Sequence, residues 1–210
     1  MPSYLMKTYR TVFWLNSVSF LLVLALIVYA KFFGSSVSEL FLQPPFHCSI
    51  DVAFLTHTFQ ILCSVPPVVC AFTFGLLRRI QPRRSENLFI LYSALLTGGF
   101  LFNEIYRLHV ILGMAGFPKL ATISVYAIIL LGYGLAFKRR IQSTPYLILL
   151  VGLGLLAFGI LIDSLHLNLG ALSILLEGFP KLFSEINIIL YFWYVCYGEI
   201  MRSLNSSVRF

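Results

Sequence analysis

Six long runs of apolar residues, separated by short polar segments, occupy most of this 210-residue chain. A helix needs about 20 mainly apolar residues to cross the hydrocarbon core of a bilayer, and each run approaches or exceeds that length. Charged residues make up only 11% of the chain, against roughly 25% in soluble domains. The pattern excludes a water-soluble fold and predicts an all-α, polytopic transmembrane helix bundle of about six spans. The expected spans are Thr11–Ala30, Val52–Leu77, Leu88–Val110, Pro118–Phe137, Pro145–Ile162 and Pro180–Met201.

No polar linker or change of composition marks a boundary, so we expect a single integral membrane domain over residues 1–210. The net charge of +7 does not predict nucleic-acid binding, because the basic residues occur in short clusters between apolar runs. The cysteines show neither a CxxC pair nor zinc-finger spacing. We expect Cys63, Cys70 and Cys196 to be small packing residues within helices.

The distribution of basic residues predicts the orientation, because positively charged short loops are retained in the cytoplasm. One side of the predicted topology has only Lys31, Arg107, Lys119 and Lys181, each at a helix end. The opposite side collects Lys7, Arg10, Arg78, Arg79, Arg83, Arg84, Lys138, Arg139, Arg140, Arg202 and Arg209. We therefore expect both termini in the cytoplasm and the protein in the plasma (inner) membrane. The first run lacks a convincing cleavage site, so we expect it to remain as a signal anchor.

The pentamer Gly-Phe-Pro-Lys-Leu occurs twice, at Gly116–Leu120 and Gly178–Leu182, and each copy leads into an apolar run. Glycine permits a tight turn and proline suits the first position of a helix. The repeat predicts a duplicated helical hairpin, formed by spans three and four and by spans five and six. The alternative is that only turn chemistry was copied. The apolar stretch Leu167–Leu176 is too short to cross, so we expect an interfacial or half-inserted helix there.

Proline and glycine predict two further features of the helices. Pro66-Pro67 inside the second run predicts a kink or break, because proline removes a helix hydrogen bond and clashes with the preceding turn. Glycines clustered within single runs predict close helix contacts. These glycines are Gly98 with Gly99, Gly132 with Gly134, and Gly152 with Gly154 and Gly159.

Ionisable residues concentrate near the outer ends of the predicted spans. Placing such a group within a membrane costs ~2.5–3.5 kcal/mol, which makes these residues candidates for function. The candidate polar site comprises Glu104, Arg107, His109, Asp163, His166, Glu177 and Lys181. We expect Pro180 to start a new helix, so the spacing of Glu177 and Lys181 does not by itself establish a contact between them.

Spacing groups the other candidates into pairs. Glu104 and Arg107 are three residues apart, as are Asp163 and His166, so each pair shares a helix face if its helix continues that far. A structural ion pair is the alternative to a substrate-binding role for the first pair. With His109, the two helices can supply mixed N/O ligands. No dense ligand motif supports a metal, so we assign none, and the cofactor stays unknown.

Short motifs carry a resemblance to a known group. They are Asn103–His109 followed by Gly116–Lys119, and the later segment Leu176–Lys181. The C-terminal half resembles a group of uncharacterised bacterial multi-pass membrane proteins, whose spans end in an acid-rich segment, a Leu-His pair and a Gly-x-Pro turn. Val110 stands where that group has an acid directly after the histidine. The resemblance implies a multi-pass membrane fold and carries no activity.

Three functions are compatible with these features, and whether the protein is an enzyme is left open. The first is a binding or assembly role, in which the outer polar cluster contacts a lipid headgroup, a pigment or quinone, or a partner membrane protein. The second is an intramembrane lipid-modifying enzyme using Glu104, His109, Asp163 and His166 as acid/base or metal groups. The third is a small transporter, which ranks last because the span midpoints are almost uncharged.

Overall fold

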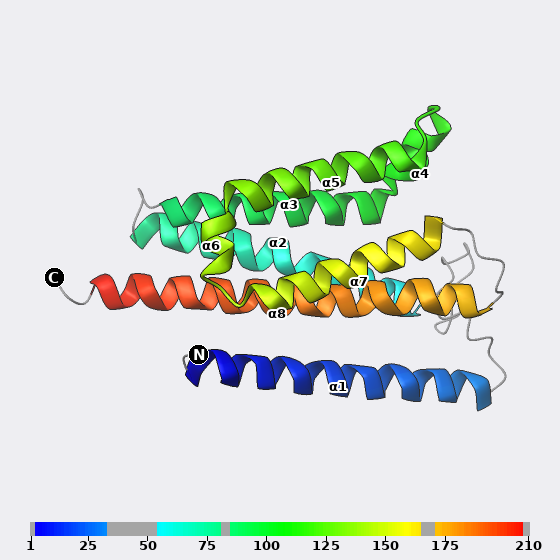
Figure 1. The fold of residues 1–210 in the computed structure, drawn as a ribbon, viewed down its shortest axis with the longest axis horizontal. Helices are drawn as coiled ribbons and strands as arrows, with labels where there is room; N and C mark the ends of the chain where they lie inside the picture. The colour runs from blue at the N-terminus through cyan, green and yellow to red at the C-terminus, as the bar shows by residue number, and fades with distance from the viewer. Residues whose placement is uncertain (1–2, 33–53, 81–84, 165–170, 208–210) are drawn as a thin grey trace. The chain divides into compact units, whose positions relative to one another are not determined.

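The computed structural model describes residues 3–32, 54–80, 85–164 and 171–207, and throughout these ranges the regular secondary structure is helical (Figure 1). The all-α prediction is therefore confirmed for the described part of the chain. The helices are α1 (Ser3–Phe32), α2 (Phe54–Ile80), α3 (Ser85–Tyr106), α4 (Leu108–Met114), α5 (Lys119–Ala136), α6 (Lys138–Gln142), α7 (Tyr146–Ser164) and α8 (Ala171–Ser207).

Four of the described helices are long and apolar enough to cross a membrane. The qualifying segments are Thr8–Tyr29, Phe54–Ile80, Asn87–Tyr106 and Tyr146–Ser164. They correspond to the first, second, third and fifth predicted spans. The apolar part of α5, Leu120–Ala136, is shorter, and α8 combines apolar residues with acidic and basic ones along its length. The structure thus supports four candidate crossings within the described residues.

Two helices continue through proline. Helix α8 is one helix of 37 residues with Pro180 inside it, so the prediction that Pro180 starts a new helix is wrong. Residues 171–176 belong to this same helix, whereas residues 167–170 of the expected interfacial segment lie outside the described residues. Pro66 and Pro67 likewise lie inside α2, which is not broken there. Each proline removes one N–H donor, so packing around it must stabilise the continuous helix.

The two copies of the pentamer differ in conformation. In the first copy Gly116 has a φ of 88°, and Pro118 is the extended residue directly before α5. This confirms the expected turn, because glycine adopts positive φ without a steric penalty. All five residues of the second copy are helical and lie within α8. The same five residues therefore adopt two different backbone conformations in this chain. The duplicated helical hairpin stays a prediction.

The chain forms two compact units. The first unit comprises residues 1–62 and 147–190, and the second comprises residues 63–146 and 191–210. Helices α2 and α8 each contribute one part to each unit.

Close contact between α7 and α8 organises the first unit. A Cβ atom at Gly152 would lie 3.2 Å from the Ser184 carbonyl oxygen, and one at Gly159 would lie 3.2 Å from the Glu177 carbonyl oxygen. The two glycines are seven residues apart, about two helical turns, so they lie on one face of α7. A Cβ atom at Gly154 would have no described neighbour within 4 Å beyond the backbone of its own helix. The predicted glycine contacts are thus confirmed at Gly152 and Gly159.

Helix α1 contacts α8 through a pair of amides. Asn16 and Asn187 donate to each other's side-chain oxygens at 3.2 and 3.0 Å. The rings of Phe20 and Phe183 lie beside them, with centroids 6.2 Å apart. Only 11% of the most apolar segment of α1 is buried. The helix therefore attaches through few contacts and leaves a large apolar surface exposed.

Aromatic rings fill part of the second unit. Phe89 stacks on Tyr133 with centroids 6.0 Å apart, and Phe137 contacts both rings. The hydroxyl groups of Ser93 and Tyr133 share a 2.6 Å hydrogen bond. Cys63, Cys70 and Cys196 are buried thiols outside any disulfide, and the last two have sulfur atoms 3.9 Å apart. The expected burial of these cysteines is confirmed.

The α7–α8 contact predicts unequal costs for the same substitution at neighbouring glycines. Gly152→Leu must force the helices apart, because backbone atoms of α8 stand where the new side chain would begin, and overpacking costs about 1–3 kcal/mol. We expect a lower unfolding temperature for the detergent-purified protein. Gly154→Leu is the matched control on the same helix and should leave the unfolding temperature close to that of the wild type. Equal losses for both variants would contradict the contact.

Candidate functional site

Three of the seven predicted site residues meet in the first unit. Asp163 lies near the end of α7, and Glu177 and Lys181 lie on α8. The Lys181 Nζ atom is 2.6 Å from Glu177 Oε1 and 3.7 Å from Asp163 Oδ2. Because α8 continues through Pro180, the four-residue spacing of Glu177 and Lys181 places them on one helix face. We call these three residues the outer triad, after the outer position that the sequence predicts for them.

Gly159 creates the space that Lys181 occupies. A Cβ atom at Gly159 would lie 2.9 Å from Lys181 Cγ, so any side chain there would displace the lysine stem. The side chains of Lys181, Asp163 and Glu177 are 23%, 29% and 37% exposed. One ammonium between two carboxylates leaves a net charge of −1 in a half-exposed setting. Such a group can bind polar partners without the full cost of buried charge.

Glu104 and Arg107 do not form the helical pair that their spacing suggested. Helix α3 ends at Tyr106, and Arg107 has a left-handed backbone with a φ of 49°. The i,i+3 geometry expected for Glu104 and Arg107 therefore does not apply. Glu104 Oε1 is 3.5 Å from the side-chain nitrogen of Asn103. Helix α4 includes His109.

Part of the predicted acid and histidine set lies outside what the structure describes. This holds for the side chain of His109 and for His166 as a whole. Glu104 belongs to the second unit and Asp163 to the first, and each is described within its own unit. Among the described residues, no three or more His, Cys, Asp or Glu side chains are grouped so that they could hold a metal ion.

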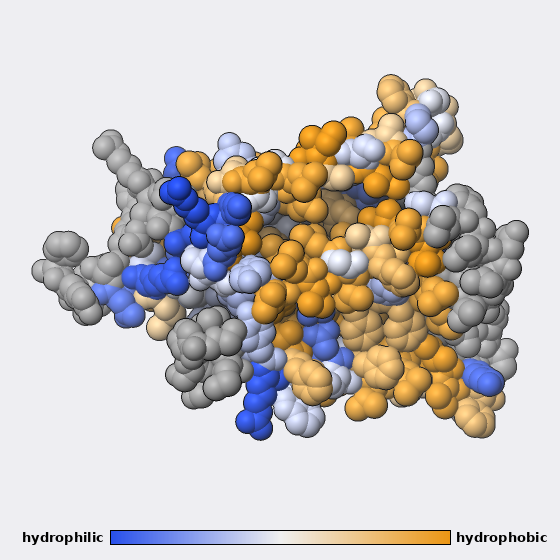
Figure 2. Space-filling view, in the orientation of Figure 1, coloured by the Kyte–Doolittle hydropathy of each residue, from blue (hydrophilic) through white to orange (hydrophobic). Residues whose placement is uncertain are grey.

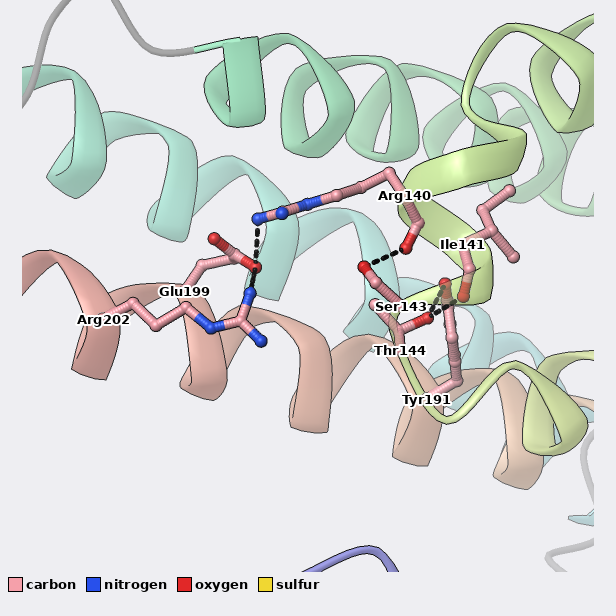
Figure 3. A network of polar contacts seen from close by, with 7 residues as sticks. All are labelled: Arg140, Ile141, Ser143, Thr144, Tyr191, Glu199 and Arg202. Atoms are coloured by element: carbon pink, nitrogen blue, oxygen red, sulfur yellow. Dashed lines mark hydrogen bonds and ion pairs between the residues drawn. The ribbon is translucent and has the colours of Figure 1, made fainter. Parts of the chain in front are cut away.

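A second polar cluster, which the sequence did not predict, lies in the second unit (Figure 3). The Glu199 side chain on α8 is 4% exposed and accepts two guanidinium contacts at one oxygen. Arg140 of α6 approaches Glu199 Oε1 to 2.6 Å, and Arg202 of α8 approaches it to 3.0 Å. Charge-assisted contacts of this kind are stronger than neutral hydrogen bonds. The buried carboxylate thus holds α6 against the last turns of α8.

The segment after α6 makes a second attachment to α8. The Thr144 hydroxyl lies 3.1 Å from the hydroxyl of Tyr191, which is fully buried. Ser143 and Thr144 also donate to the carbonyl oxygens of Arg140 and Ile141. These side-chain bonds satisfy carbonyl groups that a short helix leaves free at its end. The connection between α5 and α7 is therefore fixed to α8 at two points, as Figure 3 shows.

A signal for the Glu199 cluster was present in the sequence. Glu199 is the only acidic residue between residues 186 and 210 and lies in an otherwise apolar run. The rule that singled out the outer residues applies equally to an acid at this position. Arg140 and Arg202 served only as indicators of orientation, so their shared partner was missed.

The Glu199 cluster predicts different costs for removing its two arginines. Arg140→Gln removes the 2.6 Å contact from a buried carboxylate, which costs about 1–3 kcal/mol. Arg202 is 57% exposed, so Arg202→Gln should cost at most about 1 kcal/mol. Thermal unfolding of the purified variants measures both. In the double variant Arg140→Gln/Glu199→Gln the losses should be clearly less than additive. Additive losses would show that the two side chains do not interact.

A known family covers most of the chain. A family model described as a domain of unknown function (DUF8692) matches residues 18–196. No curated protein and no solved structure matches the chain. The matched region includes every helix from α2 to α7 and both the outer triad and Arg140. The chain belongs to the DUF8692 family.

Proposed function

We propose that the protein is a multi-pass integral membrane protein with six spans, formed by α1, α2, α3, α5, α7 and α8 as one membrane domain. Four of these helices are long and apolar enough by themselves. Helices α5 and α8 bring the number of membrane spans to six. An even number of spans places both termini on the same side, and the basic loops favour the cytoplasm. The plasma membrane is the proposed location. The pentamer repeat supports a duplicated hairpin, in which α3 and α5 form one copy and α7 and α8 the other.

Within this membrane protein we infer a binding or assembly role for the outer triad. The observation that carries the proposal is the contact of Lys181 with Glu177 and Asp163 near the end of the apolar helix α7, where α7 packs against α8. Charges at such a place are costly unless they are paired or functional. Here they are paired with one another and still partly exposed. The arrangement suits recognition of a lipid headgroup or of a polar group on a partner membrane protein.

The exposed apolar surface supports the same role. Helix α1 presents large side chains such as Phe13, Trp14 and Leu21, each more than half exposed. A surface of this size is typical of contact with lipid or with another membrane helix. The outer triad would add specificity to such a contact, because apolar packing accepts many partners whereas polar groups require complementary groups in a defined orientation.

The proposed topology predicts the behaviour of reporter fusions. A reporter that is active only in the cytoplasm should be active when fused after Arg79 or Arg139, and one active only outside should be active after Met114. The physical reason is that the basic ends of α2 and α6 resist translocation. Activity of the outside reporter after Arg79 would overturn the proposed orientation.

The binding role predicts position-dependent cross-linking in the native membrane. A photo-activatable residue in place of Leu161, close to Asp163 along α7, should give a discrete cross-linked product with a lipid or protein. The product should be lost in a Lys181→Gln background, because one member of the outer triad is then neutral. Mass spectrometry of the product identifies the partner.

Leu150 provides the matched control for this experiment. It lies eleven residues earlier on α7, close to the same helix face, and the two side chains are 55% and 54% exposed. The same probe at Leu150 should give only diffuse lipid labelling. Identical products at both positions, or a Leu161 product unaffected by Lys181→Gln, would refute the proposed role of the outer triad.

A further inference from the structure

Basic side chains gather at one end of the second unit. Figure 2 shows hydrophilic side chains around α6 and the last turns of α8, and the end of α2 lies at the same end of this unit (Figure 1). The described basic residues there are Arg78, Arg79, Lys138, Arg139, Arg140 and Arg202. We call this group the basic end. It draws on three separate helices, so the fold assembles it from distant parts of the sequence.

The basic end keeps a large surplus of positive charge. All of its members except Arg140 are exposed. Glu199, which contacts Arg140 and Arg202, supplies one negative charge and is itself buried. Among the side chains described at this end of the unit, six basic residues against this one carboxylate leave a surplus of five positive charges. A surface of this kind attracts anions.

Aromatic rings lie directly beside the basic residues. Phe137 immediately precedes Lys138 and contacts the rings of Tyr92 and Tyr133. Tyrosine is enriched at the depth of lipid headgroups, where its ring is apolar and its hydroxyl is wet. Tyr92, which is 51% exposed, therefore fits a boundary between apolar and charged surface, whereas the Tyr133 hydroxyl is bonded to Ser93.

Glu199 prepares two arginines for an anionic ligand. Its oxygen Oε1 holds Arg140 and Arg202 side by side, from different helices (Figure 3). A guanidinium has five N–H donors in a planar fork that fits phosphate oxygens. Arg202 uses one donor on Glu199 and is mostly exposed, so further donors are available to a ligand. The carboxylate limits the movement of both side chains, which lowers the entropy lost on binding.

We propose that the basic end binds the phosphate headgroups of anionic phospholipids. Clusters of four to eight basic residues at the cytoplasmic end of membrane helices have this property in general, and each residue contributes about fivefold to binding. The inference rests on the membrane placement proposed above but not on the outer triad. The phosphate contacts come from Arg202, Lys138 and Arg139, with Arg78 and Arg79 adding to the attraction.

The test uses the full chain purified in mild detergent and exposed to equal amounts of phosphatidylglycerol and phosphatidylcholine. Native mass spectrometry counts the lipids of each kind that remain bound. The wild type should retain phosphatidylglycerol in clear preference. The double variant Lys138→Gln/Arg139→Gln should lose about fivefold in this preference for each residue removed. Both side chains are exposed, so we expect the variant to fold normally.

Two controls separate the possible outcomes. Lys31→Gln removes an exposed charge at the end of α1, in the other unit, and should leave the preference unchanged. Inorganic phosphate at constant ionic strength should displace little phosphatidylglycerol if the lipid is the ligand. Complete displacement by inorganic phosphate would show a site for free phosphate and overturn the lipid assignment. Equal retention of both lipids would refute the inference while leaving the cross-linking result for the outer triad unaffected.

Discussion

The close approach of α7 and α8 is the interaction on which the first unit depends. Two glycines on one face of α7 bring its backbone against the carbonyl groups of α8. Helix association in apolar surroundings relies on such packing, because lipid tails are as apolar as the side chains that they would replace. The same approach allows Lys181 to reach Asp163 on the neighbouring helix. The glycines of α7 therefore allow both the close packing of α7 on α8 and the contact of Lys181 with Asp163.

Polar side chains within the helices follow a second constraint. Ser17, Thr58 and Ser124 each donate to the carbonyl oxygen four residues earlier in their own helix. This satisfies the hydroxyl without a partner on another helix. Side-chain hydrogen bonds between the described helices include the Asn16–Asn187 pair, the Ser93–Tyr133 pair and the Glu199 cluster. Such sites fix which helix faces meet.

The sequence was informative where local physics decides the structure. Long apolar runs predicted helices, and the glycines of α7 predicted a close helix contact, which Gly152 and Gly159 make and Gly154 does not. It failed at Pro180, because the same five residues form a turn in one place and a helix in the other. What differs is their surroundings, since Lys181 packs on Gly159 across the helix pair. Glu177, Lys181 and Asp163 were predicted as candidates, but their contact depended on a helix continuing through proline. Glu199 was missed because Arg140 lies 59 residues earlier in the sequence, on a different helix. Arg202 lies only three residues later but was considered only as a signal of orientation.

The uninterrupted course of α8 has a geometric consequence. A helix of 37 residues has a contour length of about 55 Å at 1.5 Å per residue. The hydrocarbon core is about 30 Å thick and the bilayer with its headgroups about 40–45 Å. No tilt within the usual range of about 0–40° brings the whole rod inside the hydrocarbon. In the proposed six-span arrangement, at least one end of α8 must therefore extend beyond the hydrocarbon into the headgroups or water.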